Sequence, residues 1–385
     1  MAEYSGTPGF GKLKDVSALE LGATALKGAL EKSGVPADAI DHTVVGNALQ
    51  TSADAIYGAR HVALKAGVPI DRPALTVNRL CGSGIQSVIS AAQMIKLGEA
   101  GVCAAGGIEN MSQAPHIVRG GRDGFKFGAK TELEDLLFAA LIDPMCGLFM
   151  AQTAENLAKK YEISREAQDE FALRSHQLGA EAVKSGRFAE EIVPVEIESR
   201  RGVKVIDTDD HIKPETTLEG LGKLRAAFGK DGTVTAGNAS GIVDGGAMVI
   251  VASEERGRTF TDKPLGRIVD WSVVGVEPSE MGIGPAPAIR QVCDKAGIAV
   301  GDVDLFEINE AFSAQYLACE KDLGIDREKA NVNGGAIALG HPLGATGTRL
   351  VLTLLHSLKA RSARYGIASA CIGGGQGIAL LVENA

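Results

Sequence analysis

Two cysteines and one histidine stand in glycine-rich segments of the sequence. Cys81 lies in NRLCGSG, His341 in LGHPLGATG and Cys371 in ACIGGGQG. A cysteine sulfur can attack a carbonyl carbon, and a histidine held beside it can accept the thiol proton. If the three side chains meet, they would support covalent acyl transfer with a second thiol left to move another proton.

Cys81 is expected at a strand-to-helix junction. Free backbone N–H groups and the helix dipole there favour a thiolate, and the neighbouring glycines leave room for a substrate. A buried structural thiol is the alternative for Cys81. A disulfide with Cys371 is a second alternative, which an intracellular setting disfavours.

Composition excludes several classes of protein. The chain has 385 residues with 49 glycines, about twice the average usage, and enough apolar residues for about two domains. With 48 acidic and 39 basic residues the formal charge is −9, which argues against nucleic acid or an anionic membrane bound through bulk charge.

Sequence patterns for metals, nucleotides and export are missing. The cysteines are never closer than 22 residues, so no zinc or CxxC motif exists. Nucleotide-binding fingerprints, an apolar run of 18 residues and a secretory signal are also absent from the sequence. We therefore expect an intracellular protein with no membrane span, no metal and no bound NAD or ATP.

An internal repeat organises the chain. Residues 19–49 and 282–311 both predict a helix, a glycine turn and a short apolar strand that ends at an asparagine, Asn47 or Asn309. Each copy then continues with a strand, a helix and a strand, at 74–78, 85–97 and 101–105 in the first and 331–333, 347–359 and 365–370 in the second. Alternating strands and helices predict an α/β fold with parallel βαβ units, whose ligand site lies at the carboxyl ends of the strands.

The two copies differ at their start. The second opens with a strand-like run at 265–276, whereas the first opens with MAEYSGTPGFGK, which has no run of β-forming residues. We therefore expect the first half to lack its opening strand, so that either the chain begins too late or another segment fills that place.

The segment between the copies does not follow the repeated order of strands and helices. It contains a charged helical stretch at 153–186 and strand-like pieces, and we interpret it as an inserted subdomain over the active edge of the first half. Lys213, Lys223 and Arg225 precede a glycine-rich stretch at 233–241 and could hold a phosphate; a solvated basic surface is the alternative. The predicted division is residues 1–111 with 242–258, an insertion at 112–241, and residues 259–385.

Four motifs in this order, NRLCGSG, NEAF, GHPLGATG and CIGGGQG, resemble the thiolases, which cleave 3-oxoacyl-CoA or condense two acyl-CoA units. The resemblance covers the chain from about Lys12 onward and is greatest to the 3-ketoacyl-CoA thiolases of mitochondrial fatty acid β-oxidation and their bacterial relatives. It implies a duplicated fold in five layers, α-β-α-β-α, with a loop subdomain inserted.

The resemblance also implies roles for single residues. Cys81 would be acylated, His341 would accept its proton, and Cys371 would exchange a proton with the α-carbon of acetyl-CoA. Asn309 would hold a water that, with His341, binds the thioester oxygen. The N–H groups of Cys81 and Gly373 would form a second oxyanion site.

Coenzyme A is implied as a substrate, with acyl-CoA and acetyl-CoA, and no metal or redox cofactor is needed. It would lie along Lys213, Thr216 and Ser240, with Arg225 near it. The resemblance further implies a homodimer or homotetramer, in the mitochondrial matrix or a bacterial cytoplasm.

Three departures from the family leave alternatives open. The opening strand is reduced, Lys213 replaces an arginine, and Phe149-Met150 replaces a His-Met or Pro-Met pair near the acyl pocket. The alternatives are an enzyme specific for acetoacetyl-CoA and a non-catalytic protein of the same fold. A 3-oxoacyl synthase is disfavoured, because those enzymes pair one cysteine with two histidines, or with a histidine and an asparagine, and the second cysteine in CIGGG does not fit that set.

Overall fold

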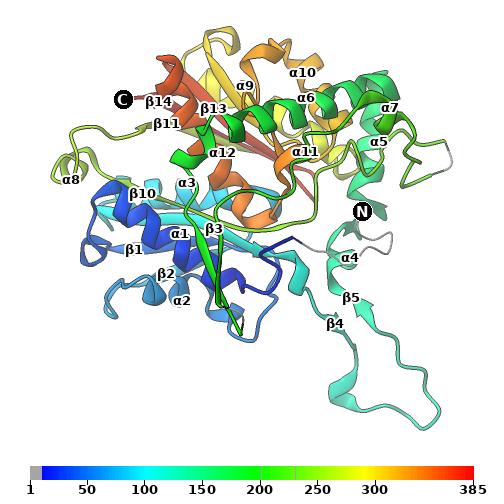
Figure 1. Ribbon diagram of the computed structural model, residues 1–385, viewed down its shortest axis with the longest axis horizontal. Helices are drawn as coiled ribbons and strands as arrows, with labels where there is room; N and C mark the ends of the chain where they lie inside the picture. The colour runs from blue at the N-terminus through cyan, green and yellow to red at the C-terminus, as the bar shows by residue number, and fades with distance from the viewer. Residues whose placement is uncertain (1–10, 201, 230) are drawn as a thin grey trace.

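Two four-stranded sheets form the framework of the computed structural model, which describes residues 11–200, 202–229 and 231–385 (Figure 1). The first sheet has the order β10-β3-β1-β2 and the second β11-β14-β13-β12. The strands of the first are β1 (His42–Gly46), β2 (Ala74–Val77), β3 (Val102–Asn110) and β10 (Asp244–Ala252). Those of the second are β11 (Gly266–Gly275), β12 (Leu305–Ile308), β13 (Tyr365–Ile372) and β14 (Gln376–Asn384).

The pairing of the strands confirms the duplication. β3 lies parallel to β1 and antiparallel to β10, and β13 lies parallel to β12 and antiparallel to β14 in the same way. The first half thus carries three parallel strands (β2, β1 and β3) and the second half two (β12 and β13), each set with its carboxyl ends at one edge and followed by an antiparallel strand. β11 adds a further antiparallel strand outside β14 in the second half.

Helices cover both sheets and separate them, which gives the predicted five layers (Figure 1). The outer helices α1 (Ala18–Ser33) and α2 (Gly58–Lys65) bury apolar side chains such as Leu26 and Val62 against the first sheet. On the far side, α9 (Pro285–Ala296) and α10 (Ser313–Leu323) cover the second sheet through residues such as Ile289 and Tyr316. The central layer is α3 (Ser83–Lys96) and α12 (Leu343–Arg361), whose isoleucines and leucines pack against both sheets.

The two central helices touch backbone to backbone near their N-termini. A Cβ atom on Gly84 of α3 would lie 2.4 Å from the backbone nitrogen of Thr348, and one on Gly347 of α12 would lie 2.4 Å from that of Ile85. Only glycine permits such an approach. The loops that precede the two helices, and therefore Cys81 and His341, are brought to the same edge.

The prediction of a strand at 331–333 is wrong. Ala330, Val332 and Gly334 form only isolated bridges, and Asn331 has a left-handed φ of 48°. The Asn331 side chain accepts from the backbone N–H of Ile308 at 2.8 Å and donates to its carbonyl at 2.9 Å, so it substitutes for a strand neighbour there. The second half accordingly has no counterpart of β2.

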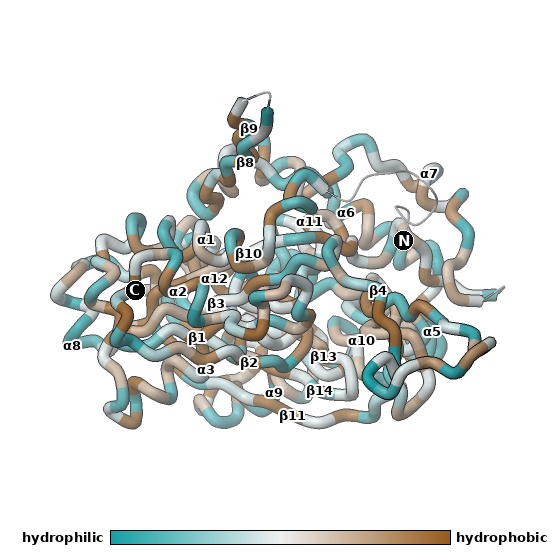
Figure 2. Tube along the Cα trace, turned by 90° about the horizontal axis from the view of Figure 1, so that it is seen from below, coloured by the Kyte–Doolittle hydropathy of each residue, from teal (hydrophilic) through white to brown (hydrophobic). Residues whose placement is uncertain are grey.

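The two longest helices of the insertion are α5 (Met150–Lys160) and α6 (Arg165–Lys184), and β8 (Val195–Ser199) and β9 (Gly202–Ile206) form a hairpin. Ser164 caps α6 by accepting from the N–H of Ala167 at 3.1 Å. Figure 2 shows the hairpin projecting from the body of the molecule.

The predicted placement of the insertion over the first half is only partly right. The short helix α4 (Leu136–Ala140) lies there, with Leu137 packed on Leu49 and Met111. In contrast, α5 and α6 pack on α10 and on α11 (Ala336–Leu339) of the second half.

The two sheets end differently at their outer edges. β11 closes the second sheet, whereas within the described residues no strand pairs with the outer edge of β10. The predicted lack of an opening strand concerns Met1–Phe10 in part, and those residues lie outside the described ranges. From Gly11 onward the first half starts directly with a turn and α1.

Candidate active site

Cys81 sits in a single tight turn, Leu80–Gly82, between β2 and α3. The preceding Leu80 has a φ of 47°, a conformation that leucine rarely adopts. Local hydrogen bonds hold it: the Leu80 N–H donates to Oδ1 of Asn78 at 2.9 Å, and the Ser83 hydroxyl donates to the Leu80 carbonyl at 2.7 Å. The turn therefore fixes the direction of the Cys81 side chain.

Two backbone N–H groups point at the half-buried thiol of Cys81, that of Gly373 and its own. Burial nevertheless raises the pKa of Cys81 to about 11, and the nearby carboxyl group of Glu109 adds to the rise. The expectation that the helix N-terminus would favour a thiolate is therefore wrong for the unliganded protein, because desolvation outweighs the two donors. Cys81 rests as a thiol.

His341 is buried and held in one orientation. Its Nδ1 lies 2.7 Å from the hydroxyl oxygen of Thr346, which itself donates to the Pro342 carbonyl at 3.0 Å, so Nδ1 carries the ring proton. Burial and the charge of Arg349 lower the pKa of His341 to about 3. The ring is thus neutral, with a lone pair on Nε2 that can accept a proton.

Asn309 lies directly after β12 and faces that lone pair. Its Nδ2 is 3.4 Å from Nε2 of His341, while its Oδ1 is buried and has no partner among the described groups. An unpartnered buried acceptor leaves a place for a water or a ligand donor. Asn309 and His341 are therefore brought together as the sequence predicted.

Cys371 is the next-to-last residue of β13, and Ile372 separates it from the Gly373-Gly374-Gly375 turn. It is buried against Met281 and Ala311, with Met150 and Phe312 beside them. Burial, followed by the nearby thiol groups of Cys81 and Cys319, raises the pKa of Cys371 well above its usual range. Cys81 and Cys371 thus lie close enough to interact electrostatically, and both are free thiols.

Sequence reasoning missed Thr346 and Glu109. Thr346 lies five residues after His341 in the same motif, which was a usable signal. Glu109 gave none, because its partners are mainly backbone groups from distant segments. Its carboxylate accepts from the N–H groups of Ala48 at 3.0 Å, Leu49 at 2.9 Å and Gly344 at 2.9 Å, and so joins the loop after β1 to the start of α12.

Of the four residues implied to bind coenzyme A, Ser240 and Thr216 are half-buried, and Lys213 and Arg225 are exposed. Ser240 lies at the site, because its N–H donates to the carbonyl of Ala311 at 3.0 Å. Thr216 is half-buried, and its hydroxyl donates to the Lys213 carbonyl at 2.8 Å. Lys213 and Arg225 are exposed, one before and one after the short helix α7 (Leu218–Gly222), and Lys223 at the end of that helix pairs with Glu219 at 2.6 Å.

An aromatic cluster lies where the acyl pocket was expected. Phe149 contacts Phe138 and Phe228, with ring centroids 4.8 and 5.1 Å apart. Met150 borders the site, since a Cβ on Gly373 would lie 3.3 Å from its sulfur.

Neither a metal cluster nor a membrane-spanning helix is found in the described ranges. No group of three or more histidine, cysteine or acidic side chains there is arranged to hold a metal ion. None of the helices in the same ranges has the length and apolarity needed to cross a membrane.

Comparisons with known proteins agree with this geometry. Residues 5–255 match the family model "Thiolase, N-terminal domain" and residues 262–384 match "Thiolase, C-terminal domain". The chain is 51% identical over 374 residues to the mitochondrial 3-ketoacyl-CoA thiolase of Homo sapiens, covering 97% of this chain and 94% of the relative. It is 48% identical over 375 residues to the acetyl-CoA acetyltransferase of Chromobacterium violaceum, covering 97% and 95%.

The fold of this chain is also similar to that of a solved structure. The crystal structure of human mitochondrial 3-ketoacyl-CoA thiolase in complex with CoA superimposes with a TM-score of 0.94 at 51% identity, over 97% of this chain and 93% of that one. Both halves of the chain, its fold and the order of its motifs therefore agree, and the chain belongs to the thiolase family.

Proposed function

We propose that this protein catalyses the CoA-dependent cleavage of 3-oxoacyl-CoA into acetyl-CoA and a shortened acyl-CoA, and the reverse condensation, through an acyl group carried on Cys81. The observation that carries the proposal is the convergence of the Gly373 and Cys81 N–H groups on the Cys81 sulfur. Two donors at the attacking atom are placed to bind the oxygen of a carbonyl attacked there.

In the first half of the reaction the Cys81 sulfur attacks C3 of the 3-oxoacyl chain while Nε2 of His341 takes the thiol proton. The carbonyl oxygen becomes an oxyanion beside the two N–H groups. The C2–C3 bond then breaks, its electron pair forms the acetyl-CoA enolate, and Cys371 donates a proton to C2. Asn309 and His341 would stabilise the enolate oxygen, with a water on Asn309 as one of the donors.

In the second half the thiol of coenzyme A attacks the acyl group on Cys81. Its proton passes to the Cys371 thiolate, which restores that thiol. The Cys81 sulfur leaves and recovers its proton from His341. Every proton moved in the first half is thereby returned, and no metal or redox cofactor takes part.

Coenzyme A is proposed to lie along Ser240, Thr216, Lys213 and Arg225. Support comes from Ser240, which is tied to the loop that carries Asn309. The exposed Lys213 and Arg225 would face the phosphate groups, with Lys213 acting as a point charge rather than a bidentate donor. The relative whose structure was solved with CoA supports this partner for the family.

The test is turnover of acetoacetyl-CoA and free CoA, followed as loss of the enolate absorbance. Cys81→Ala should abolish turnover and the acyl-enzyme seen by mass spectrometry. Cys146→Ser, at another half-buried free cysteine, is the matched control and should retain activity. If the unmodified protein turned over no faster than Cys81→Ala, the protein would be a non-catalytic member of the family.

Chain length is a separate question, because both 3-ketoacyl-CoA thiolases and acetyl-CoA acetyltransferases are among the relatives. We propose short to medium 3-oxoacyl-CoA substrates in the degradative direction, as part of fatty acid β-oxidation. The measurement is the ratio of kcat/KM for longer and C4 esters. A strict C4 preference would instead assign an acetoacetyl-CoA-specific enzyme.

Domain limits, assembly and location are also proposals. We propose halves at 1–111 with 242–258 and at 259–385, separated by an insertion at 112–241. Support comes from β10, which follows the insertion and yet completes the first sheet. We further propose a homodimer or homotetramer of intracellular location, in the mitochondrial matrix or a bacterial cytoplasm, and sedimentation velocity would measure the assembly.

A further inference from the structure

The segment that carries Asn309 is held on both sides by one side chain. Asn331 accepts from the N–H of Ile308 at 2.8 Å and donates to its carbonyl at 2.9 Å, and the same amide donates to Oε1 of Glu310 at 2.8 Å. Ile308 and Glu310 are the two chain neighbours of Asn309. The Glu310 carboxyl group therefore closes a ring of hydrogen bonds around the residue that faces His341.

Glu310 is fully buried and has no part in any step of the reaction proposed above. Its Oε2 accepts from the hydroxyl of Ser175 at 2.6 Å and from the N–H of Ile337 at 3.2 Å. Gly335 packs against the carboxyl group, because a Cβ there would lie 2.2 Å from Cδ of Glu310. Burial raises the pKa of Glu310, and the three hydrogen-bond donors oppose that rise. The side chain is thus fixed by groups of α6, of α11 and of the loop before α11.

The Asn309 side chain has few restraints of its own. Its Nδ2 lies 3.4 Å from Nε2 of His341, and its Oδ1 has no partner among the described groups. His341, in contrast, is fixed by Thr346 at Nδ1 and by its own backbone N–H, which donates to the carbonyl of Gly241 at 2.9 Å. The position of the Asn309 amide therefore depends on the backbone on either side of it.

The first half of the repeat uses the equivalent asparagine differently. Asn47 follows β1 as Asn309 follows β12, and the Asn47 amide donates to the carbonyl of Leu49 at 3.0 Å and to Oε1 of Glu109 at 2.8 Å. Asn47 thus holds its own loop. In the second half the Asn309 amide is left for the site, and the neighbouring Glu310 makes the bonds that hold the loop.

Glu310 also joins this loop to the inserted segment. Ser175, the hydroxyl donor to Glu310, lies on α6. The next residue of that helix, His176, accepts at Nδ1 from the backbone N–H of Lys213 at 3.3 Å. The part of the chain proposed to bind coenzyme A is therefore connected to Asn309 through α6.

We propose that Glu310 is a positioning residue, which holds the Asn309 amide where it binds the enolate oxygen of acetyl-CoA. This inference rests on the proposed acyl transfer and adds to it a residue that touches no substrate. Without the bonds at Glu310 residues 308–310 can shift, and misplacement of a catalytic group by about 1 Å can lower a rate about a hundredfold. Transfer of an acyl group between Cys81 and coenzyme A forms no enolate and should change much less.

Glu310→Gln tests the proposal. It keeps the size of the side chain, but whichever way the new amide turns, its NH2 group faces a donor, Asn331 or Ile337. Two rates are compared: cleavage of acetoacetyl-CoA, which passes through the enolate, and exchange of labelled CoA into acetyl-CoA, which needs only acyl transfer at Cys81. We expect cleavage to fall at least about tenfold, CoA exchange less than about threefold, and the KM for CoA to stay within about twofold. A purely structural loss lowers both rates by the same factor, so equal reductions would overturn the proposal.

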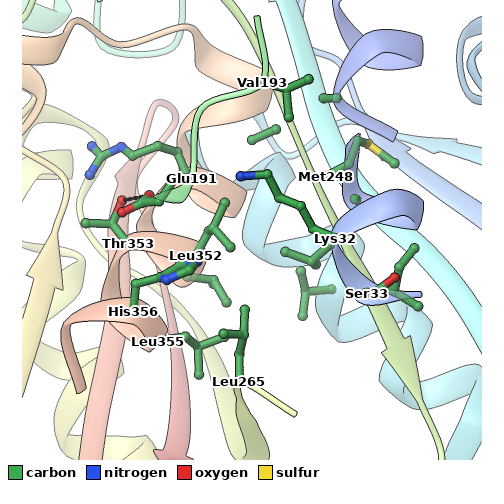
Figure 3. Close-up of a pocket in the computed structure, with 18 of the residues that line it drawn as sticks. Lys32, Ser33, Glu191, Val193, Met248, Leu265, Leu352, Thr353, Leu355 and His356 are labelled. Carbon is green, nitrogen blue, oxygen red and sulfur yellow. Dashed lines mark hydrogen bonds between the residues drawn. The ribbon is translucent and has the colours of Figure 1, made fainter. Parts of the chain in front are cut away.

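Glu191→Gln is the matched control. The Glu191 side chain is only 6% exposed and accepts from the hydroxyl of Thr353 at 2.7 Å, a bond that Figure 3 shows. Its partners, Arg187 and Thr353, belong to neither the cysteine turn nor the histidine loop. Loss of this buried carboxylate should lower stability and yet leave the ratio of cleavage to CoA exchange as in wild type.

Ser175→Ala is the second variant, should Glu310→Gln not fold. It removes one donor to the carboxyl group, from a residue of the insertion, and should lower cleavage several-fold relative to CoA exchange. Introduced into Glu310→Gln, the same change should add little, because both substitutions act through one contact. Fully additive losses, or an unchanged ratio in Ser175→Ala alone, would contradict the proposal.

A measurement that needs no turnover separates this proposal from the proposed function. Hydrogen exchange of the unliganded protein, followed by mass spectrometry, should be faster in Glu310→Gln than in wild type for peptides covering 305–312 and 331–339, and unchanged for those covering β1 and β3. If wild type showed no cleavage but this local increase appeared, the acyl transfer would fail and the hold of Glu310 on Asn309 would stand. Unchanged hydrogen exchange at 305–312 would overturn the positioning role whatever the activity.

Discussion

Asn309 presents its side-chain amide to Nε2 of His341 at a distance of 3.4 Å. The imidazole is neutral, because burial lowers its pKa to about 3, and its other nitrogen is occupied by Thr346. The contact therefore places a neutral donor beside the one atom of the ring that can accept a proton. It also leaves the Asn309 carbonyl oxygen unpartnered.

Replacing Asn309 tests whether this amide acts in the reaction. Asn309→Ala removes a donor from the enolate side of the site and should lower kcat by about 10²–10³-fold, as for loss of one oxyanion donor. Acylation of Cys81 by the 3-oxoacyl substrate should be slowed as much as turnover, because the enolate forms in that half of the reaction, whereas attack of coenzyme A on the acyl group should be slowed less. Asn333→Ala is the control, since Asn333 donates to Ser357 at 2.8 Å away from the site, and its kcat should stay within about twofold. An equal effect of the two changes would contradict the assigned role.

Thr346 is expected to act as a positioning residue for His341. Thr346→Val removes the acceptor of the Nδ1 proton, so the ring can turn or change tautomer, and kcat should fall by about tenfold or more with little change in KM. Thr346→Ser keeps the hydroxyl and should restore most of the rate. Failure of serine to rescue would instead attribute the loss to packing, because Thr346 is buried.

The raised pKa of Cys81 predicts slow alkylation of the unliganded protein. With a pKa of about 11 the thiolate fraction is small at pH 7 and grows about tenfold for each unit of pH. The rate of labelling of Cys81 by iodoacetamide, followed by peptide mass spectrometry, should therefore rise between pH 7 and 9.5 without a plateau. A plateau below pH 8 would show a thiolate at rest.

Glu109 should make stability depend on pH. Burial raises its pKa to about 7 from 4.5, so the folded protein holds a proton there that the unfolded chain releases between these values. Its contribution is fully present below pH 4.5 and decreases as the pH rises to 7. Glu109→Gln removes this change, so the free energy of unfolding of wild type minus variant should shrink over that range in urea titrations. A difference that grows with pH would contradict the assignment.

Much of the fold could be predicted because the sequence repeats itself. Two helices, two turn glycines and two strand-ending asparagines recur in one order, and local patterns decide such elements. The motif residues could likewise be placed at one edge, since they follow strands of the repeat. Asn331 could not be predicted as a loop residue, because its conformation depends on bonds to Ile308 in a distant strand.

The protonation states of the groups in the site could not be predicted from the sequence. Whether Cys81 is a thiol or a thiolate depends on how far burial outweighs two N–H donors, and burial follows from tertiary packing. Glu109 escaped prediction for the same reason, since its backbone partners come from segments far apart in the chain. These are long-range consequences of the fold rather than of any motif.

The contact between Gly84 and Gly347 sets how closely α3 and α12 approach each other, because each glycine has only a hydrogen atom where other residues have a Cβ. α3 carries the cysteine turn at its start and α12 carries the histidine loop, and they meet where any larger side chain would collide with backbone. A single added methyl group at either glycine would push the helices apart and alter the gap between nucleophile and base. The separation of Cys81 and His341 thus depends on two glycines of the central helix layer, neither of which is proposed to take part in the reaction.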